Sequence, residues 1–435
     1  MNQRILLATL LVCKLFGPLP AMTPPKATTV SPAALGFDPA RLARLSGVMQ
    51  GFVDRKELPG MVLFVMRDGQ VVARLALGHQ DVAGTVPMRA DTIFRIASMS
   101  KAVTSVAVLI LLEEGKLRLE DPLAKFLPEF KNVQVAVPGK EGEPPKLEKP
   151  SRAITLRDLL THRSGISYSW NGTGPVQEAY RKLGVSDGLV DAGITLAENM
   201  ARLAQAPLVQ EPGKAFHYGL STDVLGRVVE VASGQSLDAF LQARIFAPLK
   251  MPDTGFSVPP GKVFRLAEVA TGTEGGGLRA MQDPERFNLV NLAPRAAIKP
   301  GNRYFSGGAG LVSTANDYAR FLQMLCNRGV LEGARILAPK TVDLLTASAT
   351  RDLPSIAPGL EFGLGVALLT DLGASGKLGT PGLYSWSGLY GSVFWVDPKE
   401  RLVAVLMTQR YPYGGHDWMS VFRTQVYQAL MKPKD

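Results

Sequence analysis

Each end of the chain carries a pair of strand-like runs, and this symmetry limits the folds that the sequence can adopt. Near the amino end, the runs 61–66 and 71–77 flank the dipeptide Asp68-Gly69, a combination typical of a β-hairpin. Near the carboxyl end, the runs 392–396 and 402–407 are joined by a short polar turn. We therefore expect one antiparallel sheet built from both ends of the chain.

Helical patterns flank these strands. Asp38-Pro39 marks a helix start, because aspartate caps a helix and proline suits its first turn, and apolar residues follow at helical spacing up to Phe52. A second helix is expected at about 417–431. These two terminal helices should cover one face of the sheet.

The middle of the chain reads as helices and loops, with no strand-helix-strand alternation and no internal repeat. The prediction is an α/β fold with an antiparallel sheet flanked by helices, at about 36–118 and 341–435. A mostly helical subdomain at about 119–340 completes it, and a cleft between the two parts is the natural place for a site.

Composition excludes several classes of function. The formal net charge is +10, but basic and acidic residues are interspersed, so we expect no nucleic-acid partner. Four histidines without metal-ligand spacing predict no metal, and no cofactor motif is present. The two cysteines, Cys13 and Cys326, cannot form a disulfide framework if a leader is removed, and Cys326 reads as an inert thiol in an apolar helix.

The first 21 residues have a basic start, a short apolar stretch and a small residue at Ala21, which favours a cleaved signal peptide. The stretch is too short for stable membrane insertion. We expect a periplasmic or secreted protein. The alternative is an uncleaved amino end and a cytoplasmic protein, and Lys14 within the apolar stretch favours that alternative.

The segment Ser98-Met99-Ser100-Lys101 opens an apolar helix that ends near Gly115. Ser98 is expected at the first turn of this helix, with Lys101 on the same face. Free N–H groups at a helix start favour negative charge on an attacked carbonyl, and a lysine among apolar neighbours loses its proton more easily. The pair thus suits a nucleophilic serine and its activator. The alternative is a serine that only caps the helix and a lysine that reaches solvent.

The Ser98 segment resembles the active-site box of class C β-lactamases, D-alanyl-D-alanine carboxypeptidases and family VIII carboxylesterases. Other segments match this group in the same order along the chain, namely 156–162, 164–166, 212–226, 305–314 and 394–398. The resemblance implies the β-lactamase/transpeptidase-like fold and an acyl-serine intermediate.

The resemblance also implies further site residues. Tyr218 stands where the group has the tyrosine of its Tyr-x-Asn element, so Tyr218 is expected to carry the proton of Ser98. Leu220 replaces the asparagine and cannot donate its hydrogen bond to a substrate, but we expect its apolar side chain to contact a neutral acyl ester together with Trp386 and Leu389. The alternative for Tyr218 is a core tyrosine whose hydroxyl is hydrogen-bonded.

The third element of the group is usually Lys-Thr-Gly, and Trp386-Ser387-Gly388 is its counterpart here. We expect these residues to bind substrate, and the N–H groups of Ser98 and Leu389 to form the oxyanion hole. Loss of the lysine makes binding of penicillins and peptides doubtful. Trp386 as a mere packing residue, and Lys377-Leu378-Gly379 as a rival third element, remain the alternatives.

A second serine motif, residues 184–188, matches Gly-x-Ser-x-Gly, but that motif works only between a strand and a helix. Helical sequence precedes it, so Ser186 is expected in a surface turn. A triad around Ser186 would need His79, His162, His217 or His416.

These observations predict a serine hydrolase, with carboxylesterase activity on short-chain or compact esters as the first hypothesis. A β-lactamase or D-alanyl-D-alanine carboxypeptidase is the second. A non-catalytic peptidoglycan-binding relative is the alternative from another class, and the retained Ser98, Lys101 and Tyr218 argue against it.

Overall fold

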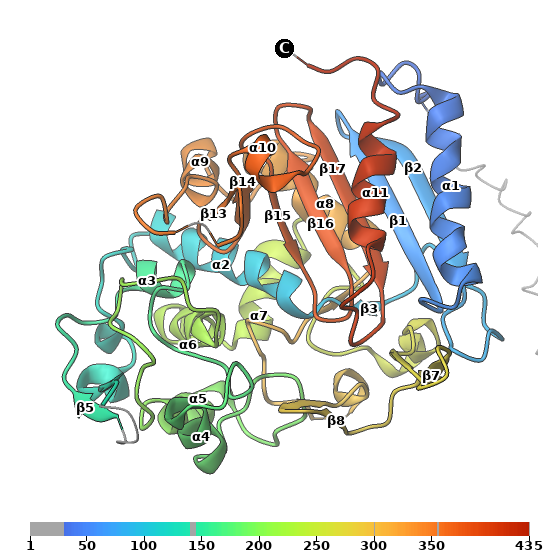
Figure 1. The fold of residues 1–435 in the computed structure, drawn as a ribbon. Helices are drawn as coiled ribbons and strands as arrows, with labels where there is room; N and C mark the ends of the chain where they lie inside the picture. Colours follow the sequence, from blue (N-terminus) through green and yellow to red (C-terminus); the bar gives the residue numbers. More distant parts are fainter. Residues whose placement is uncertain (1–29, 140–144, 300, 355, 435) are drawn as a thin grey trace, which may run out of the picture.

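A seven-stranded antiparallel sheet forms the centre of the computed structural model, which describes residues 30–139, 145–299, 301–354 and 356–434 (Figure 1). The strand order is β13-β14-β15-β16-β17-β1-β2. The strands are β1 (Gly60–Arg67), β2 (Gln70–Gly78), β13 (Leu360–Phe362), β14 (Ala367–Leu369), β15 (Tyr384–Ser387), β16 (Val393–Asp397) and β17 (Leu402–Thr408). The predicted fold class is confirmed.

The two ends of the chain meet at the pairing of β1 with β17, where Leu63 lies opposite Leu406. The hairpin between β1 and β2 turns at Asp68 and Gly69, both of which have positive φ (54° and 74°). Glycine adopts this conformation without strain and aspartate tolerates it, which explains why this dipeptide is a strong hairpin signal.

Side chains of β17 alternate between the two faces of the sheet. Leu402, Ala404 and Leu406 join the apolar cluster under α1 (Pro39–Asp54) and α11 (Trp418–Tyr427). The intervening residues 403, 405 and 407 pack into the larger cluster on the other face. Figure 1 shows α1 and α11 together on the near face, as the sequence predicts.

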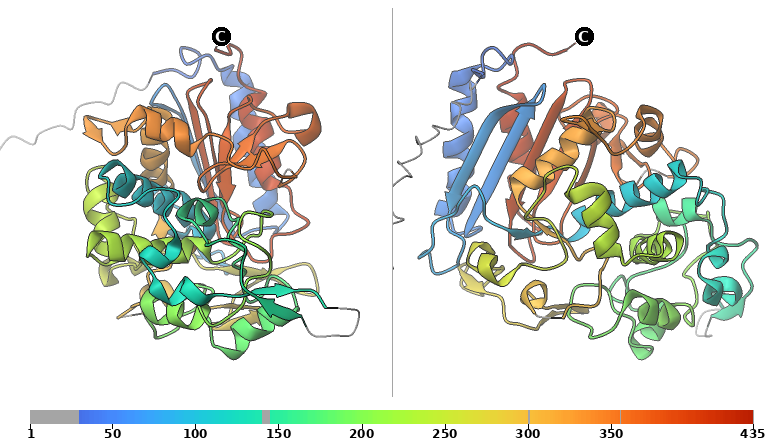
Figure 2. Two further views of the ribbon diagram at one scale, coloured as in Figure 1. Left: turned by 90° about the vertical axis from the view of Figure 1, so that its left-hand side faces the viewer. Right: turned by 180° about the vertical axis from the view of Figure 1, so that it is seen from behind.

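The far face of the sheet is covered by α2 (Ser100–Glu113) and α8 (Ala315–Cys326), which Figure 2 shows from behind. Helix α8 packs on β17 and β1 although it falls within the range expected for the helical part. The sheet part in space therefore includes α8, which lies before the boundary expected near residue 341. Cys326 at the end of α8 is partly buried, and burial raises the pKa of its thiol to about 12.

The helical part below the sheet contains short helices and small two-stranded hairpins. The helices are α3 (Leu156–Leu160), α4 (Pro175–Lys182), α5 (Leu196–Leu203), α6 (Ser221–Ser233) and α7 (Leu237–Leu241). The hairpins pair β4 (Val135–Val137) with β5 (Lys146–Glu148), β6 (Ala270–Gly272) with β7 (Leu278–Ala280), and β8 (Glu285–Phe287) with β9 (Val290–Leu292). Further strands and α-helices are β3 (Phe94–Arg95), β10 (Val312–Ser313), β11 (Val330–Leu331), β12 (Ala334–Arg335), α9 (Pro339–Leu345) and α10 (Leu372–Ser375).

Within the described ranges, no helix combines the length and apolarity that a bilayer crossing requires. The expected signal peptide, residues 1–21, and Cys13 lie outside the described residues.

A buried ion pair at Arg67, the last residue of β1, connects this strand to segments from both ends of the chain. Arg67 Nη2 lies 2.6 Å from Glu400 Oε2, and both side chains are 3% exposed. Arg67 also donates to the carbonyl oxygens of Leu35 and Lys432, at 2.9 and 2.8 Å. A buried cation that satisfies three separate segments couples their positions to one another.

We expect Glu400→Ala to lower the free energy of unfolding by about 3–5 kcal/mol, because it leaves Arg67 buried without its partner. The matched control is Asp343→Asn, which breaks the exposed pair with Arg328 and should cost less than about 1 kcal/mol. Urea unfolding followed by circular dichroism measures both. Equal losses in the two variants would contradict the expected role of the pair.

Candidate active site

Ser98 lies in a tight 3₁₀ turn, Ala97–Met99, which connects β3 to α2. Its neighbours Ala97 and Met99 are buried, whereas Ser98 is partly exposed. Ala97 has φ of +43°, an unfavourable conformation for a residue with a side chain. Strain of this kind is found where the surrounding structure holds a functional residue in place.

Lys101 is fully buried one turn further along α2. Its Nζ lies 3.4 Å from Ser98 Oγ, 3.0 Å from the Tyr168 hydroxyl and 2.8 Å from the Gly308 carbonyl oxygen. These three acceptors match the three N–H donors of an ammonium group. The alternative that Lys101 extends to solvent is therefore wrong.

Tyr218 reaches Ser98 from the loop before α6. Its hydroxyl donates to Ser98 Oγ at 2.8 Å, and Lys101 Nζ lies 4.8 Å from the centre of its ring. The next residue must be Gly219, because a Cβ there would lie 2.1 Å from the Ile166 carbonyl oxygen. The close approach of these two backbones places Tyr218 over Ser98.

Tyr168 is a site residue that the sequence analysis did not find. Its hydroxyl accepts a hydrogen bond from Lys101, and its ring stacks on Trp170 with centroids 4.8 Å apart. Burial, together with the nearby Tyr218 and Asp223, raises the pKa of Tyr168 well above its usual value, so it stays a neutral phenol. No spacing in the sequence connects Tyr168 to Lys101, which lies 67 residues earlier.

Asp223, in the first turn of α6, is a second unforeseen group next to Lys101. It is fully buried, and neither carboxylate oxygen has a hydrogen-bond partner of good geometry. Burial raises the pKa of Asp223 to about 6, although the Ser306 hydroxyl, Lys101 and the Gly308 N–H act in the opposite direction.

Gly308 is the point where these polar groups converge. A Cβ at this position would lie 2.9 Å from Asp223 Oδ2, 3.4 Å from Lys101 Nζ and 3.5 Å from the Tyr168 hydroxyl. Any side chain here would displace at least one of them. The absence of a side chain at residue 308 is therefore part of the site.

Trp386 and the loop after β15 form the opposite wall. The Trp386 ring lies 5.7 Å from the ring of Tyr218 and 5.2 Å from that of Phe362, and its indole N–H is buried without a partner. A Cβ on Gly388 would lie 2.6 Å from the Ile96 carbonyl oxygen, so this loop runs directly against the Ser98 turn. Leu389 packs in the same apolar cluster as Ala97.

Other predicted residues lie apart from the nucleophile. Leu220 is fully buried in the main core, so its side chain is not available to a substrate. Ser387 lies beside Tyr413, and burial raises the pKa of the Tyr413 hydroxyl. Lys377 lies at the rim of a separate cavity against α11.

Ser186 lies in the loop between α4 and α5, without the strand that a nucleophile elbow needs. The loop agrees with the prediction, but the expected exposure is wrong, because Ser186 is only 7% exposed. Its Oγ accepts the Gly188 N–H, and its own N–H donates to Asn199. The hydroxyl thus has a structural role in shaping the loop.

Among the described residues, no histidine is hydrogen-bonded to the hydroxyl of Ser98 or Ser186. Burial lowers the pKa of His162 far below its usual value, and its neutral ring packs 4.8 Å from that of Tyr218. His217 contacts the Ser167 hydroxyl at 2.9 Å, and His416 contacts Glu57 at 2.8 Å. In the ranges that the structure describes, no group of three or more His, Cys, Asp or Glu side chains is arranged to hold a metal.

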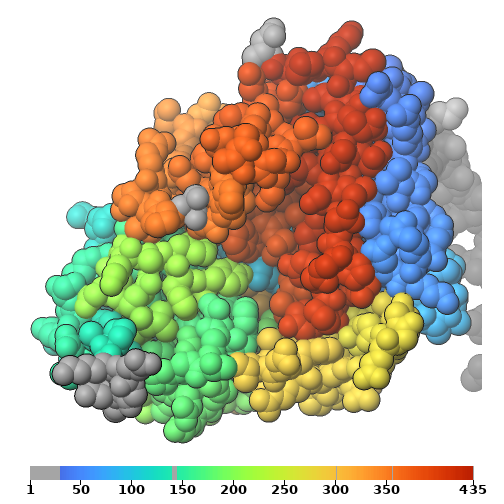
Figure 3. Space-filling view, in the orientation of Figure 1, coloured from blue at the N-terminus to red at the C-terminus, as the bar shows by residue number. Residues whose placement is uncertain are grey.

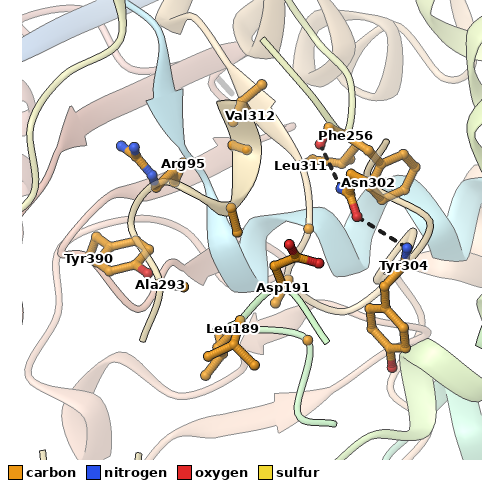
Figure 4. A pocket seen from close by; sticks show the side chains of 16 residues that line it. Arg95, Leu189, Asp191, Phe256, Ala293, Asn302, Tyr304, Leu311, Val312 and Tyr390 are labelled. Carbon is orange, nitrogen blue, oxygen red and sulfur yellow. Dashed lines mark hydrogen bonds between the residues drawn. The ribbon is translucent and has the colours of Figure 1, made fainter. Parts of the chain in front are cut away.

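Figure 3 shows the surface hollowed where the green, orange and red parts of the chain meet. A small cavity lies near the Ser98 turn and is lined by Arg95 and Tyr390 among others (Figure 4). Its volume is about 60 Å³. Burial lowers the pKa of Arg95 to about 10, so it stays charged, and it donates to the carbonyl oxygens of Pro294 and Ala267. This cavity has room for little more than water.

Comparison with known proteins gives consistent results. The Beta-lactamase family model matches residues 45–424. Esterase EstB of Burkholderia gladioli is 36% identical over 396 residues, which cover 88% of this chain and 94% of EstB. The structure of "EstCE1, a hydrolase with promiscuous acyltransferase activity" has a TM-score of 0.78 at 30% identity and covers 89% of this chain and 99% of its own. Simvastatin synthase (LovD) of Aspergillus terreus has a TM-score of 0.74 at 26% identity, with coverage of 89% and 98%.

The raised pKa of Asp223 predicts a pH-dependent cost of folding. Its pKa is about 6 in the folded chain against 3.8 in a model carboxyl, so between these values the unfolded chain loses the proton first. The free energy of unfolding should therefore fall as pH rises through this window, by about 3 kcal/mol for this group. We expect the free energy of unfolding of Asp223→Asn, relative to that of wild type, to rise by about 3 kcal/mol between pH 4 and pH 8. Urea unfolding measures this free energy for both proteins at each pH. A difference between the two proteins that does not change with pH would contradict the prediction.

Proposed function

We propose that this chain, which belongs to the Beta-lactamase family and is a serine hydrolase, is a carboxylesterase. In this proposal the reaction proceeds through an acyl-serine intermediate at Ser98. One observation carries the proposal. The Ser98 hydroxyl is hydrogen-bonded to Tyr218 at 2.8 Å and lies 3.4 Å from the buried Lys101 ammonium position. A serine with a proton acceptor in reach and a cation behind it has the parts that nucleophilic catalysis requires.

In the proposed acylation step, Tyr218 as a phenolate takes the proton of Ser98 while Oγ attacks the ester carbonyl. Lys101, held by Tyr168 and Gly308, supplies the positive charge that favours the phenolate. The N–H groups of Ser98 and Leu389 stabilise the tetrahedral oxyanion. As the intermediate collapses, the Tyr218 hydroxyl returns the proton to the leaving alkoxide.

Deacylation repeats these steps with water in place of the alcohol. Tyr218 takes a proton from water as its oxygen attacks the acyl carbonyl, and Ser98 leaves with that proton. Lys101 in its neutral form is the other candidate base, because its Nζ lies 3.4 Å from Ser98 Oγ. Either assignment uses the same three side chains.

The walls next to Ser98 favour a neutral reacting end of the acyl group over a β-lactam. Trp386 occupies the position where the resembling families have a lysine, and it joins Tyr218 and Phe362 in an aromatic surface. Leu220 provides no amide and is buried. Ester cleavage also needs less activation of the leaving group than amide cleavage.

We expect Ser98→Ala to lower kcat for p-nitrophenyl butyrate by at least about 10⁴-fold, because it removes the nucleophile. Ser186→Ala is the matched control, since it deletes the same hydroxyl from the other serine motif. It should change kcat less than about threefold and cost about 1 kcal/mol of stability through the lost bond to Gly188. Wild-type turnover by Ser98→Ala, or complete loss in Ser186→Ala, would overturn the assignment.

A substrate comparison separates the esterase from the β-lactamase hypothesis. On one preparation, kcat/KM for p-nitrophenyl butyrate should exceed that for a chromogenic cephalosporin by about 100-fold or more, since the third element lacks its cation. Ser98→Ala serves as the blank for both substrates. A cephalosporin preference of similar size would instead favour the β-lactamase.

A further inference from the structure

A second cavity, of about 460 Å³, lies between α11 and the edge strands of the sheet. It is bounded by residues of β13 to β16, by the segment after α10 and by residues 419–424 of α11. Trp386, Ser387 and Phe216 also line it, so the cavity adjoins the wall of the candidate active site. Its size suits one arm of a small molecule rather than a protein segment.

The walls of this cavity are amphiphilic. Ser385 and Ser387 line the cavity from β15, whereas the side chain of Tyr384, which does not line it, belongs to the core. Ser420 and Thr424 present two more hydroxyls, one helical turn apart on α11. The apolar part of the lining is formed by Ile356, Ala357, Leu360, Leu378, Val393, Trp395 and Met419.

Two cations line this cavity without acidic partners. Arg423 lies over the ring of Trp395, with its guanidinium carbon 5.1 Å from the ring centre. Lys377 is at the exposed rim. In the part of the chain that the structure describes, neither side chain has a carboxylate within 4 Å or donates a hydrogen bond, unlike Arg320, which pairs with Glu332.

The charge balance at this place is positive. Asp397 is the acid that acts on Arg423, but it is fully buried and already accepts hydrogen bonds from Tyr427 and Thr380. Lys377 and Arg423 line the same cavity, and partial burial and repulsion by Arg423 lower the pKa of Lys377. An anion between them would relieve this repulsion.

We infer that the ester substrate has an arm ending in a carboxylate, which enters this cavity and binds Arg423 and Lys377. The inference rests on the proposed esterase function. A planar guanidinium held over an aromatic ring suits a planar carboxylate, which it can bind through two parallel hydrogen bonds. The apolar walls accommodate the hydrocarbon part of the arm, and Trp386 separates this arm from the reacting carbonyl at Ser98.

The experiment compares matched esters that differ only in the terminal group. The mono-4-nitrophenyl esters of adipic and suberic acid carry the carboxylate, whereas 4-nitrophenyl hexanoate and octanoate lack it. We expect Arg423→Gln to lower kcat/KM for the carboxylate esters by about tenfold or more, mainly through KM, and to leave the neutral esters within about twofold. Lys377→Gln should act in the same direction, and Arg423→Lys should retain part of the preference.

Lys399→Gln is the matched control, because it removes one positive charge from the exposed turn after β16. It should change all four esters alike. A wild-type enzyme that hydrolyses the neutral esters but shows no gain from the carboxylate would overturn the inference while the proposed function stands. Equal losses on both kinds of ester in Arg423→Gln would assign that residue a structural role and also overturn it.

A binding measurement decides the case in which neither ester is cleaved, which would contradict the proposed function. Calorimetry on the Ser98→Ala protein compares monomethyl adipate with dimethyl adipate, which has no charge. Tighter binding of the monomethyl ester, lost in the Ser98→Ala/Arg423→Gln protein, would support the carboxylate site. Equal or undetectable binding of both compounds would overturn it.

Discussion

The candidate site depends on one buried cation. Lys101 lies in the first turn of an apolar helix, where a buried ammonium group without partners would be strongly destabilised. It is accommodated because acceptors from three segments converge on it, namely Ser98, Tyr168 and the Gly308 carbonyl. Those segments must therefore come together wherever α2 is in place. The requirement that stabilises the lysine also places the candidate nucleophile beside its proton acceptor.

The sheet provides the frame for this arrangement. Pairing of β1 with β17 closes the two ends of the chain into one sheet, and α2 packs against its far face. Strand β15 then delivers Trp386 and the Gly388 loop to the turn that carries Ser98. Because Gly388 and Gly219 allow backbones to approach where a Cβ would clash, the two walls of the site close around Ser98 without side chains between them.

The distribution of charge separates the reacting centre from its surroundings. The third element, which carries a lysine in the resembling families, is here an aromatic wall of Trp386, Tyr218 and Phe362. Positive charge without acidic partners appears instead behind that wall, at Arg423 and Lys377. A site organised in this way favours substrates whose reacting end is neutral and whose distal end is anionic.

The sequence by itself determined the hairpin at Asp68-Gly69, the terminal helices, the sheet from both ends and the helix that begins beside Ser98. These are local patterns of turn chemistry and periodicity, whereas the expectation that Tyr218 joins Ser98 and Lys101 came from the resemblance to a known family. Tertiary structure alone decided that Tyr168, Asp223 and Gly308 surround Lys101, that Leu220 is buried, and that Ser186 is not exposed. It also decided that Arg423 and Lys377 share a cavity. Contacts between residues tens or hundreds of positions apart leave no period or spacing in the sequence, because packing of whole elements, rather than local conformation, brings them together.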